Sequence, residues 1–208
     1  MKAVLTLIGL LCISTAFAQN FEGKIIYNNT YKSKNAKVSN EQLEQTFGNT
    51  QEYYVKNDKY KSVVNGKVMH WQIYNSFENR LYNKMGNSDI LFWINGAKND
   101  DEVVGFKLNK GATTVLGNKC DELVLTCNNG TQKYYFNSKF SIDPSMFSQH
   151  KYGNYYNYLS KAKAVPLKII METPQFILES TAVEIVPEKL NNKEFDIPAI
   201  ARIQEMPS

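Results

Sequence analysis

The chain has 208 residues and a formal net charge of +4 at pH 7, and nearly all of its positive charge comes from lysine. Arginine occurs only at Arg80 and Arg202. Because specific recognition of phosphates and bases favours the planar arginine fork, this composition argues against nucleic acid as a partner. The length suits one domain with a sizeable buried core.

Residues 1–18 have the three parts of a secretory signal peptide. Lys2 gives a positive start, residues 3–16 form a nearly unbroken apolar run, and Ala16-Phe17-Ala18 offers small residues at a cleavage site before Gln19. The run is too short to span a membrane comfortably, and no later run approaches that length. We expect an exported, periplasmic or extracellular protein without a transmembrane segment in its mature chain, organised as one β-rich domain over residues 19–208.

Cys12 offers an alternative, because a bacterial lipoprotein keeps a lipidated cysteine as its mature N-terminus. The residue before such a cysteine is normally small, but here it is Leu11, and Cys12 lies in the middle of the apolar run. The pattern favours removal of Cys12 with the leader.

Cys120 and Cys127 remain after cleavage, and export invites a disulfide between them. The six residues between them contain no turn former and are typical of a strand, which would separate the two Cα atoms by about 23 Å. A disulfide needs them within about 7 Å. The odd spacing would also place the two side chains on opposite faces. We therefore expect two free, mostly buried thiols.

Alternating apolar and polar residues between turn signals predict a mainly β (α+β) fold. Asn65-Gly66, Asn95-Gly96 and Asn129-Gly130 have the composition of type I′ hairpin turns. Around ten strands joined by short turns indicate one antiparallel curved sheet or half-open β-barrel. The expected strands are 21–31, 53–56, 59–65, 67–74, 80–84, 90–94, 103–108, 113–116, 120–127, 131–137, 167–172 and 176–186.

Two segments have helical patterns, and we expect them to cover or plug the concave side of the sheet. Ser39 followed by Gln42 forms a capping box, which predicts a helix over residues 40–47 that ends at Gly48. Asp143-Pro144 starts a second segment, over residues 143–163, with helical turns around Gly153.

No catalytic signature or phosphate-binding loop occurs in the sequence, so we predict no enzyme and no cofactor. His70 lies mid-strand, and we interpret it as a sheet residue bonded to a cross-strand neighbour. His150 lies in a polar stretch, and we interpret it as an exposed loop residue. A nucleophilic pair of Cys127 with His70 stays open, but nothing in the spacing favours it. Residues 99–102 could attract a cation but lack the spacing of a calcium loop, so we predict no metal site.

The aromatic residues are more informative. The chain has 13 tyrosines and 11 phenylalanines, and Tyr152, Tyr155, Tyr156 and Tyr158 fall within seven residues. A tyrosine ring is apolar while its hydroxyl stays hydrated, so such clusters suit ligand surfaces. A helix that plugs the sheet would need the same residues, and a plug that moves is a lid. The residues that we predict to bind a ligand are Trp71, Trp93, Tyr155, Tyr156 and Tyr158.

Several short motifs carry a family resemblance. They are the opening residues 21–27 (FEGKIIY), residues 117–122 (GNKCDE), 133–136 (KYYF), 164–169 (AVPLKI) and 194–198 (EFDIP). With this layout the chain resembles exported Gram-negative proteins similar to the GLPGLI family and to the LolA/LolB lipoprotein-carrier group. The Gly-Leu-Pro-Gly-Leu-Ile signature is absent, and residues 164–169 occupy the comparable place. The resemblance implies a half-open barrel around a helical plug with an apolar cavity between them, and it carries over no functional residue.

These observations lead to two functional hypotheses. The first is non-enzymatic binding of an apolar or amphiphilic ligand, such as a lipid, an acyl chain or a lipoprotein tail. The second is a cell-envelope interaction or structural protein that binds a protein or a glycan. A cavity larger than about 300 Å³ would favour the first hypothesis, whereas a filled barrel with a flat aromatic patch would favour the second.

Overall fold

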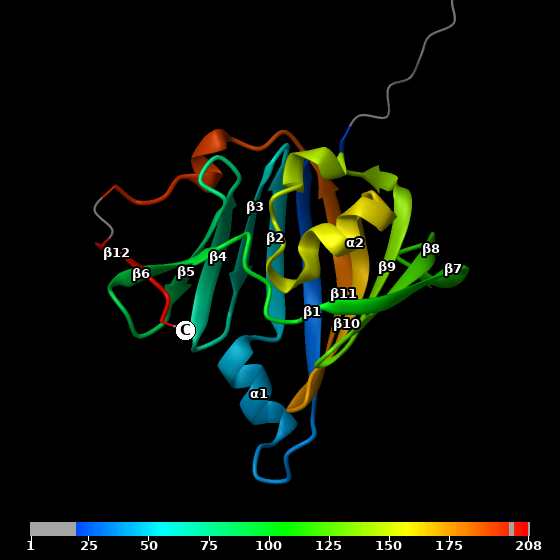
Figure 1. Ribbon diagram of the computed structural model, residues 1–208, viewed down its shortest axis with the longest axis horizontal. Coiled ribbons are helices and arrows are strands. Elements are labelled where there is room, and N and C mark those ends of the chain that lie inside the picture. The colour runs from blue at the N-terminus through cyan, green and yellow to red at the C-terminus, as the bar shows by residue number, and fades with distance from the viewer. Residues whose placement is uncertain (1–19, 200–201, 208) are drawn as a thin grey trace, which may run out of the picture.

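The computed structural model describes residues 20–199 and 202–207, so the predicted leader with Cys12 and its cleavage site lies outside the described residues. The described chain forms one twelve-stranded sheet with short helices, as Figure 1 shows. The strands are β1 (Gly23–Ser33), β2 (Thr50–Lys56), β3 (Lys59–Val64), β4 (Met69–Asn75), β5 (Arg80–Met85), β6 (Ile90–Asn95), β7 (Val103–Val115), β8 (Asn118–Cys127), β9 (Gly130–Ser141), β10 (Ala164–Glu172), β11 (Phe176–Pro187) and β12 (Arg202–Glu205). The helices are α1 (Asn40–Phe47), α2 (Tyr155–Ala162) and the 3₁₀ segments η1 (Pro144–Phe147), η2 (Tyr152–Asn154) and η3 (Asn192–Phe195).

The sheet is open, and its strand order is β12-β6-β5-β4-β3-β2-β1-β11-β10-β9-β8-β7. Neighbouring strands are antiparallel except for β12, which lies parallel to β6. The prediction of a mainly β, curved antiparallel sheet is confirmed. In the described part of the chain, no helix has both the length and the apolar character needed to cross a bilayer.

Helix α1 begins and ends as its sequence predicts. The Ser39 hydroxyl accepts from the Gln42 N–H (3.2 Å), and the Gln42 side chain accepts from the Ser39 N–H (2.8 Å), which completes the capping box. Gly48 ends the helix with φ of 93°. The second segment also starts at Asp143, whose side chain accepts from the Ser145 N–H, but its first part is the 3₁₀ turn η1.

The predicted type I′ geometry is wrong at the Asn-Gly pairs. A type I′ turn needs positive φ at both central residues, but Asn65, Asn95 and Asn129 do not have it. Both angles are positive instead at Leu116 (47°) and Gly117 (74°), which join β7 to β8. Gly117 adopts this conformation at no steric cost because glycine has no Cβ.

The main hydrophobic core lies on the concave face, where α2 packs against β8, β9 and β10. Figure 1 shows α2 across this face, with β2 to β6 on one side of it and β7 to β9 on the other. The core contains Leu123, Leu125, Phe147 and Leu159, all of them buried. The sheet and the helical segment therefore share one interior.

Cys120 and Cys127 are free thiols and buried, as predicted. Their expected placement on opposite faces is wrong, because both belong to the main core. The alternation slips by one residue between Cys120 and Leu123, where β7 has an irregularity between Asn109 and Thr113. A bulge bends and twists the strand pair, so Cys120 can still reach the core at an odd spacing from Cys127.

Candidate functional site

A cavity of about 230 Å³ lies between the concave face of the sheet and the segment that leads into α2. Its deep wall is made of buried side chains, including Tyr27, Tyr60 and Leu81, whereas Gln51 and Gln72 are half-buried. The complete lining is Tyr27, Gln51, Tyr53, Tyr60, Ser62, Gln72, Leu81, Tyr134, Tyr152, Gly153, Tyr155, Tyr158, Pro166, Ile169 and Met171.

Strand register explains how distant residues meet in this cavity. Successive side chains of a strand point to opposite faces, and cross-strand partners share a face. Tyr27 is paired with Gln51, and Ser62 is paired with Gln72. On the other side of β1, Ile169 of β10 is paired with Tyr134 of β9. Both wings of the sheet thus place side chains on the same concave face.

The chain enters α2 through two residues in the left-handed region. Gly153 has φ of 60°, in the region that favours glycine, and no atom lies within 4 Å of where a Cβ would be. Asn154 has φ of 64° and is fully buried. Its side chain donates to the Asp101 carbonyl (2.9 Å) and accepts from the side-chain amides of Asn99 (2.8 Å) and Asn157 (3.0 Å). These bonds offset the cost of the left-handed backbone and fix the start of α2.

The hydroxyls of the deep tyrosines have partners inside the protein. Tyr27 donates to the Pro166 carbonyl (2.6 Å), and Tyr158 donates to the Ala164 carbonyl (2.6 Å). The Tyr53 and Tyr155 hydroxyls bond to each other (2.9 Å). Burial raises the pKa of Tyr27, Tyr53, Tyr155 and Tyr158, so these residues stay neutral. The rings can therefore serve as apolar walls without an unmet hydroxyl.

His150 lies behind the cavity wall in an aromatic stack, so the expectation of an exposed loop residue is wrong. It is 1 % exposed, and its ring lies 4.1 Å from the Tyr74 ring and 4.7 Å from the Tyr155 ring. Its Nε2 bonds to the Tyr60 hydroxyl (2.8 Å), whereas Nδ1 has no hydrogen-bond partner among the described residues. Burial lowers the pKa of His150 to about 3, and the nearby backbone of Gly96 opposes this to a smaller extent.

Two of the five predicted ligand-binding residues line the cavity, namely Tyr155 and Tyr158. Tyr156 does not line it, and the Lys151 ammonium lies 3.9 Å from the centre of its ring. The structure does not bring Trp71 or Trp93 to the cavity. Trp71 precedes Gln72, which faces the cavity, and Trp93 precedes Ile94, which packs on the main core. Alternation places both tryptophans on the opposite face, where Arg80 covers the Trp93 ring at 4.1 Å.

Most of the lining comes from residues that no sequence signal singles out. Tyr53, Tyr60, Ser62 and Gln72 come from three consecutive strands that form a simple meander. Their alternation with outward residues was visible in the sequence and could have marked the shared face. The sequence does not show which face of the sheet α2 covers, because this depends on contacts between residues that are far apart in the chain.

The other chemistry considered from the sequence does not form a site. Cys127 and His70 are not brought together, since six strands separate β8 from β4 in the sheet order. His70 is exposed on β4. Asp101 stabilises the turn between β8 and β9 instead, because its carboxylate accepts from the Asn129 N–H (2.9 Å). Over residues 20–199 and 202–207, no three His, Cys, Asp or Glu side chains group as metal ligands would.

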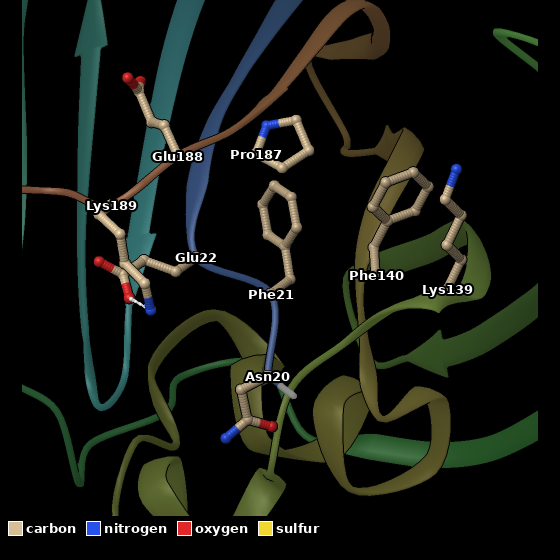
Figure 2. A pocket seen from close by; sticks show the side chains of 8 residues that line it. All are labelled: Asn20, Phe21, Glu22, Lys139, Phe140, Pro187, Glu188 and Lys189. Atoms are coloured by element: carbon tan, nitrogen blue, oxygen red, sulfur yellow. Dashed lines mark hydrogen bonds and ion pairs between the residues drawn. The ribbon is translucent and has the colours of Figure 1, made fainter. Parts of the chain in front are cut away.

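A wider groove of about 440 Å³ lies where β1 begins, and Figure 2 shows it. Phe21, Phe140 and Pro187 lie at its centre, with charged side chains around them. The Phe21 and Phe140 rings meet edge to face at 5.6 Å, and both are buried. Glu22 accepts from the Leu190 N–H (2.8 Å) and pairs with Lys189 (3.5 Å), so these groups already satisfy one another. The contacts in this groove hold the segment after β11 against the start of β1. The tyrosine-lined cavity is therefore the better candidate site.

Fold and site define an open, mainly antiparallel sheet whose helical segment closes over a tyrosine-lined cavity. The sequence matches no protein family, and no curated protein matches it. Among solved structures, the fold is distantly similar to a LolA superfamily protein from Nitrosomonas europaea, with a TM-score of 0.40 and 8% identity over 86% of this chain and 91% of the other. It is also distantly similar to PNGF-II, with a TM-score of 0.42 and 13% identity over 88% of this chain. The chain spans about a third (32%) of PNGF-II.

Proposed function

We propose that this protein binds one small amphiphilic molecule in the tyrosine-lined cavity, without catalysing a reaction. The observation that carries the proposal is the cavity itself, a mostly apolar space whose polar side chains are the half-buried Gln51 and Gln72 and the buried Ser62. Burial of the ligand's apolar part among the deep rings would supply most of the affinity, at about 25 cal/mol per Å². The leader-like residues 1–18 support a place outside the cytoplasm, in the periplasm or the extracellular space.

The cavity volume limits the size of the ligand. About 230 Å³ falls short of the roughly 300 Å³ that would favour ligand binding over a partner surface, so the proposal is restricted to a small ligand. A single short chain suits this space, whereas the several acyl chains of a lipoprotein would need the α2 segment to move away.

Binding of 1-naphthylamine, a small fluorescent amphiphile suited to the limited volume, tests the proposal. We expect saturable enhancement of its fluorescence with the wild-type protein and at least tenfold weaker binding by Ile169→Trp, because a larger side chain there fills the half-buried end of the cavity. Val183→Trp is the matched control, since it makes the same kind of change on β11 at a side chain that is 54% exposed. Melting curves verify that both variants fold.

Two results would count against the proposal. One is the absence of saturable enhancement with the wild-type protein. The other is a folded Ile169→Trp protein that binds the probe as well as Val183→Trp does.

The second hypothesis, an envelope partner, has one observation in its favour. Among the described residues, strand β7 ends the sheet with an unpaired edge, and its residues Val104 and Phe106 are 64% and 62% exposed. An exposed apolar edge is a common docking surface for another chain. If the probe does not bind, this edge becomes the leading candidate for function.

A further inference from the structure

We infer that the cavity selects an amphiphile with an uncharged polar end, such as a short-chain alcohol, primary amide or monoacylglycerol, over a carboxylate or an ammonium of the same length. This inference rests on the proposed function and specifies the ligand class of that site. It depends on the polar groups of the cavity and on their charge.

The half-buried end of the cavity carries a row of neutral polar side chains on neighbouring strands. Gln51 on β2 donates to the Ser62 hydroxyl on β3 (2.8 Å). Gln72 on β4 donates to the Asn83 side-chain oxygen on β5 (2.7 Å). Ser62 and Gln72 are cross-strand partners, so the two bonded pairs lie side by side on the concave face.

This row keeps hydrogen-bonding capacity for a ligand. Each side-chain amide has two N–H donors and an acceptor oxygen, and each bond above uses one N–H. The oxygen and the second N–H of Gln51 and Gln72 can therefore face the cavity, as can the Ser62 O–H. A hydroxyl or an amide both donates and accepts, so it can meet both kinds of group. A carboxylate only accepts, and an ammonium only donates, so either ion would meet groups that it cannot satisfy.

The deep end provides few partners for an ion. Each tyrosine has one O–H, and those of Tyr27 and Tyr158 are already donated to backbone carbonyls. The Tyr134 hydroxyl donates to the Gln132 side chain (3.0 Å). One O–H of the Tyr53–Tyr155 pair is left undonated, so a charged group pushed among these rings would lose its water and gain few partners, which is a costly arrangement.

Formal charge leads to the same conclusion. None of the fifteen residues that the structure places in the cavity lining is Lys, Arg, Asp, Glu or His. An anion or a cation of the ligand would therefore be buried without a countercharge, and an unpaired buried charge is strongly disfavoured. The apolar wall is common to all three ligand types, so the polar end alone decides between them.

Titration of the ¹⁵N-labelled protein with octan-1-ol, octanoate and octylammonium at pH 7.4 tests the inference. The three probes share an eight-carbon chain and differ in charge. We expect saturable shifts of the Gln51 and Gln72 side-chain NH₂ signals with octan-1-ol, and at least tenfold weaker binding of both ions. Octanoate that saturates at the same concentration as octan-1-ol would overturn the inference and leave the proposed function intact. A lack of shifts with all three probes would overturn both.

A charge-introducing variant sharpens the test. Gln72→Lys places an ammonium at the half-buried end, and we expect it to bind octanoate at least tenfold more tightly than the wild type does. Gln175→Lys is the matched control, because it makes the same change in an exposed turn. If both variants gain octanoate affinity equally, general attraction explains the gain, and the cavity does not discriminate by charge.

Discussion

Replacing Phe147 with alanine should lower the free energy of unfolding by about 3 to 5 kcal/mol. Phe147 is fully buried, and its ring lies 5.3 Å from the Tyr155 ring and 5.8 Å from the Tyr74 ring. Truncation would remove apolar contacts and leave a hole that the stacked rings around it cannot close, because they are held by their own packing and hydrogen bonds. Urea denaturation followed by circular dichroism gives the value.

Phe77→Ala is the matched control, since the Phe77 side chain is 95% exposed. Its effect should stay within about 0.5 kcal/mol, as for other surface substitutions. Equal losses in the two variants would mean that η1 does not pack on the aromatic cluster as described.

Acid should destabilise the wild-type protein more than a His150→Gln variant. The His150 imidazole has a folded-state pKa of about 3, lowered by burial, against an ordinary value of 6.5. The unfolded chain therefore takes up this proton first as the pH falls. The stability that depends on neutral His150 is fully present above pH 6.5 and is lost progressively as the pH falls toward 3. Between pH 7 and pH 4.5 the loss from this one group is about 2 to 3 kcal/mol.

Unfolding free energies from urea titrations at pH 7 and pH 4.5 test this expectation. Glutamine has no titrating group, so His150→Gln should lose about 2 to 3 kcal/mol less over this interval than the wild type does. His70→Gln makes the same change at an exposed position and should follow the wild type. Parallel losses in wild type and His150→Gln would show that His150 becomes protonated without unfolding.

The strands and α1 could be predicted from the sequence because their signals are local. Alternation over six or seven residues identifies a strand such as β4, and the Ser39 capping box identifies the start of α1. Strand β12 could not be predicted this way. Its four residues are all exposed, so no apolar alternation marks it, and it exists because the edge of β6 accepts its backbone.

The site was predictable only in part, for a related reason. The tyrosine cluster near Gly153 was recognisable, and it supplied Tyr155 and Tyr158. Residue type alone favours the tryptophans, but packing between distant segments decides which strand face meets α2. His150 shows the same limit, because its neighbours in sequence are polar, whereas its neighbours in space are aromatic rings.

The position of β1 has a consequence for how the chain reaches this structure. The first strand lies at the centre of the sheet, between β2 and β11, and the pairing of β1 with β11 is the seam that joins the two wings. Strands β2 to β6 can pair as hairpins soon after synthesis, but the seam must wait until residue 187 is available. Until then one edge of β1 stays unpaired, and the long loop that must close makes this step slow. A chain that emerges N-terminus first therefore cannot complete its sheet until nearly all of it is present. In that state it can still pass through a narrow channel as an unfolded chain. The unpaired edge of β1 needs protection from aggregation during this time.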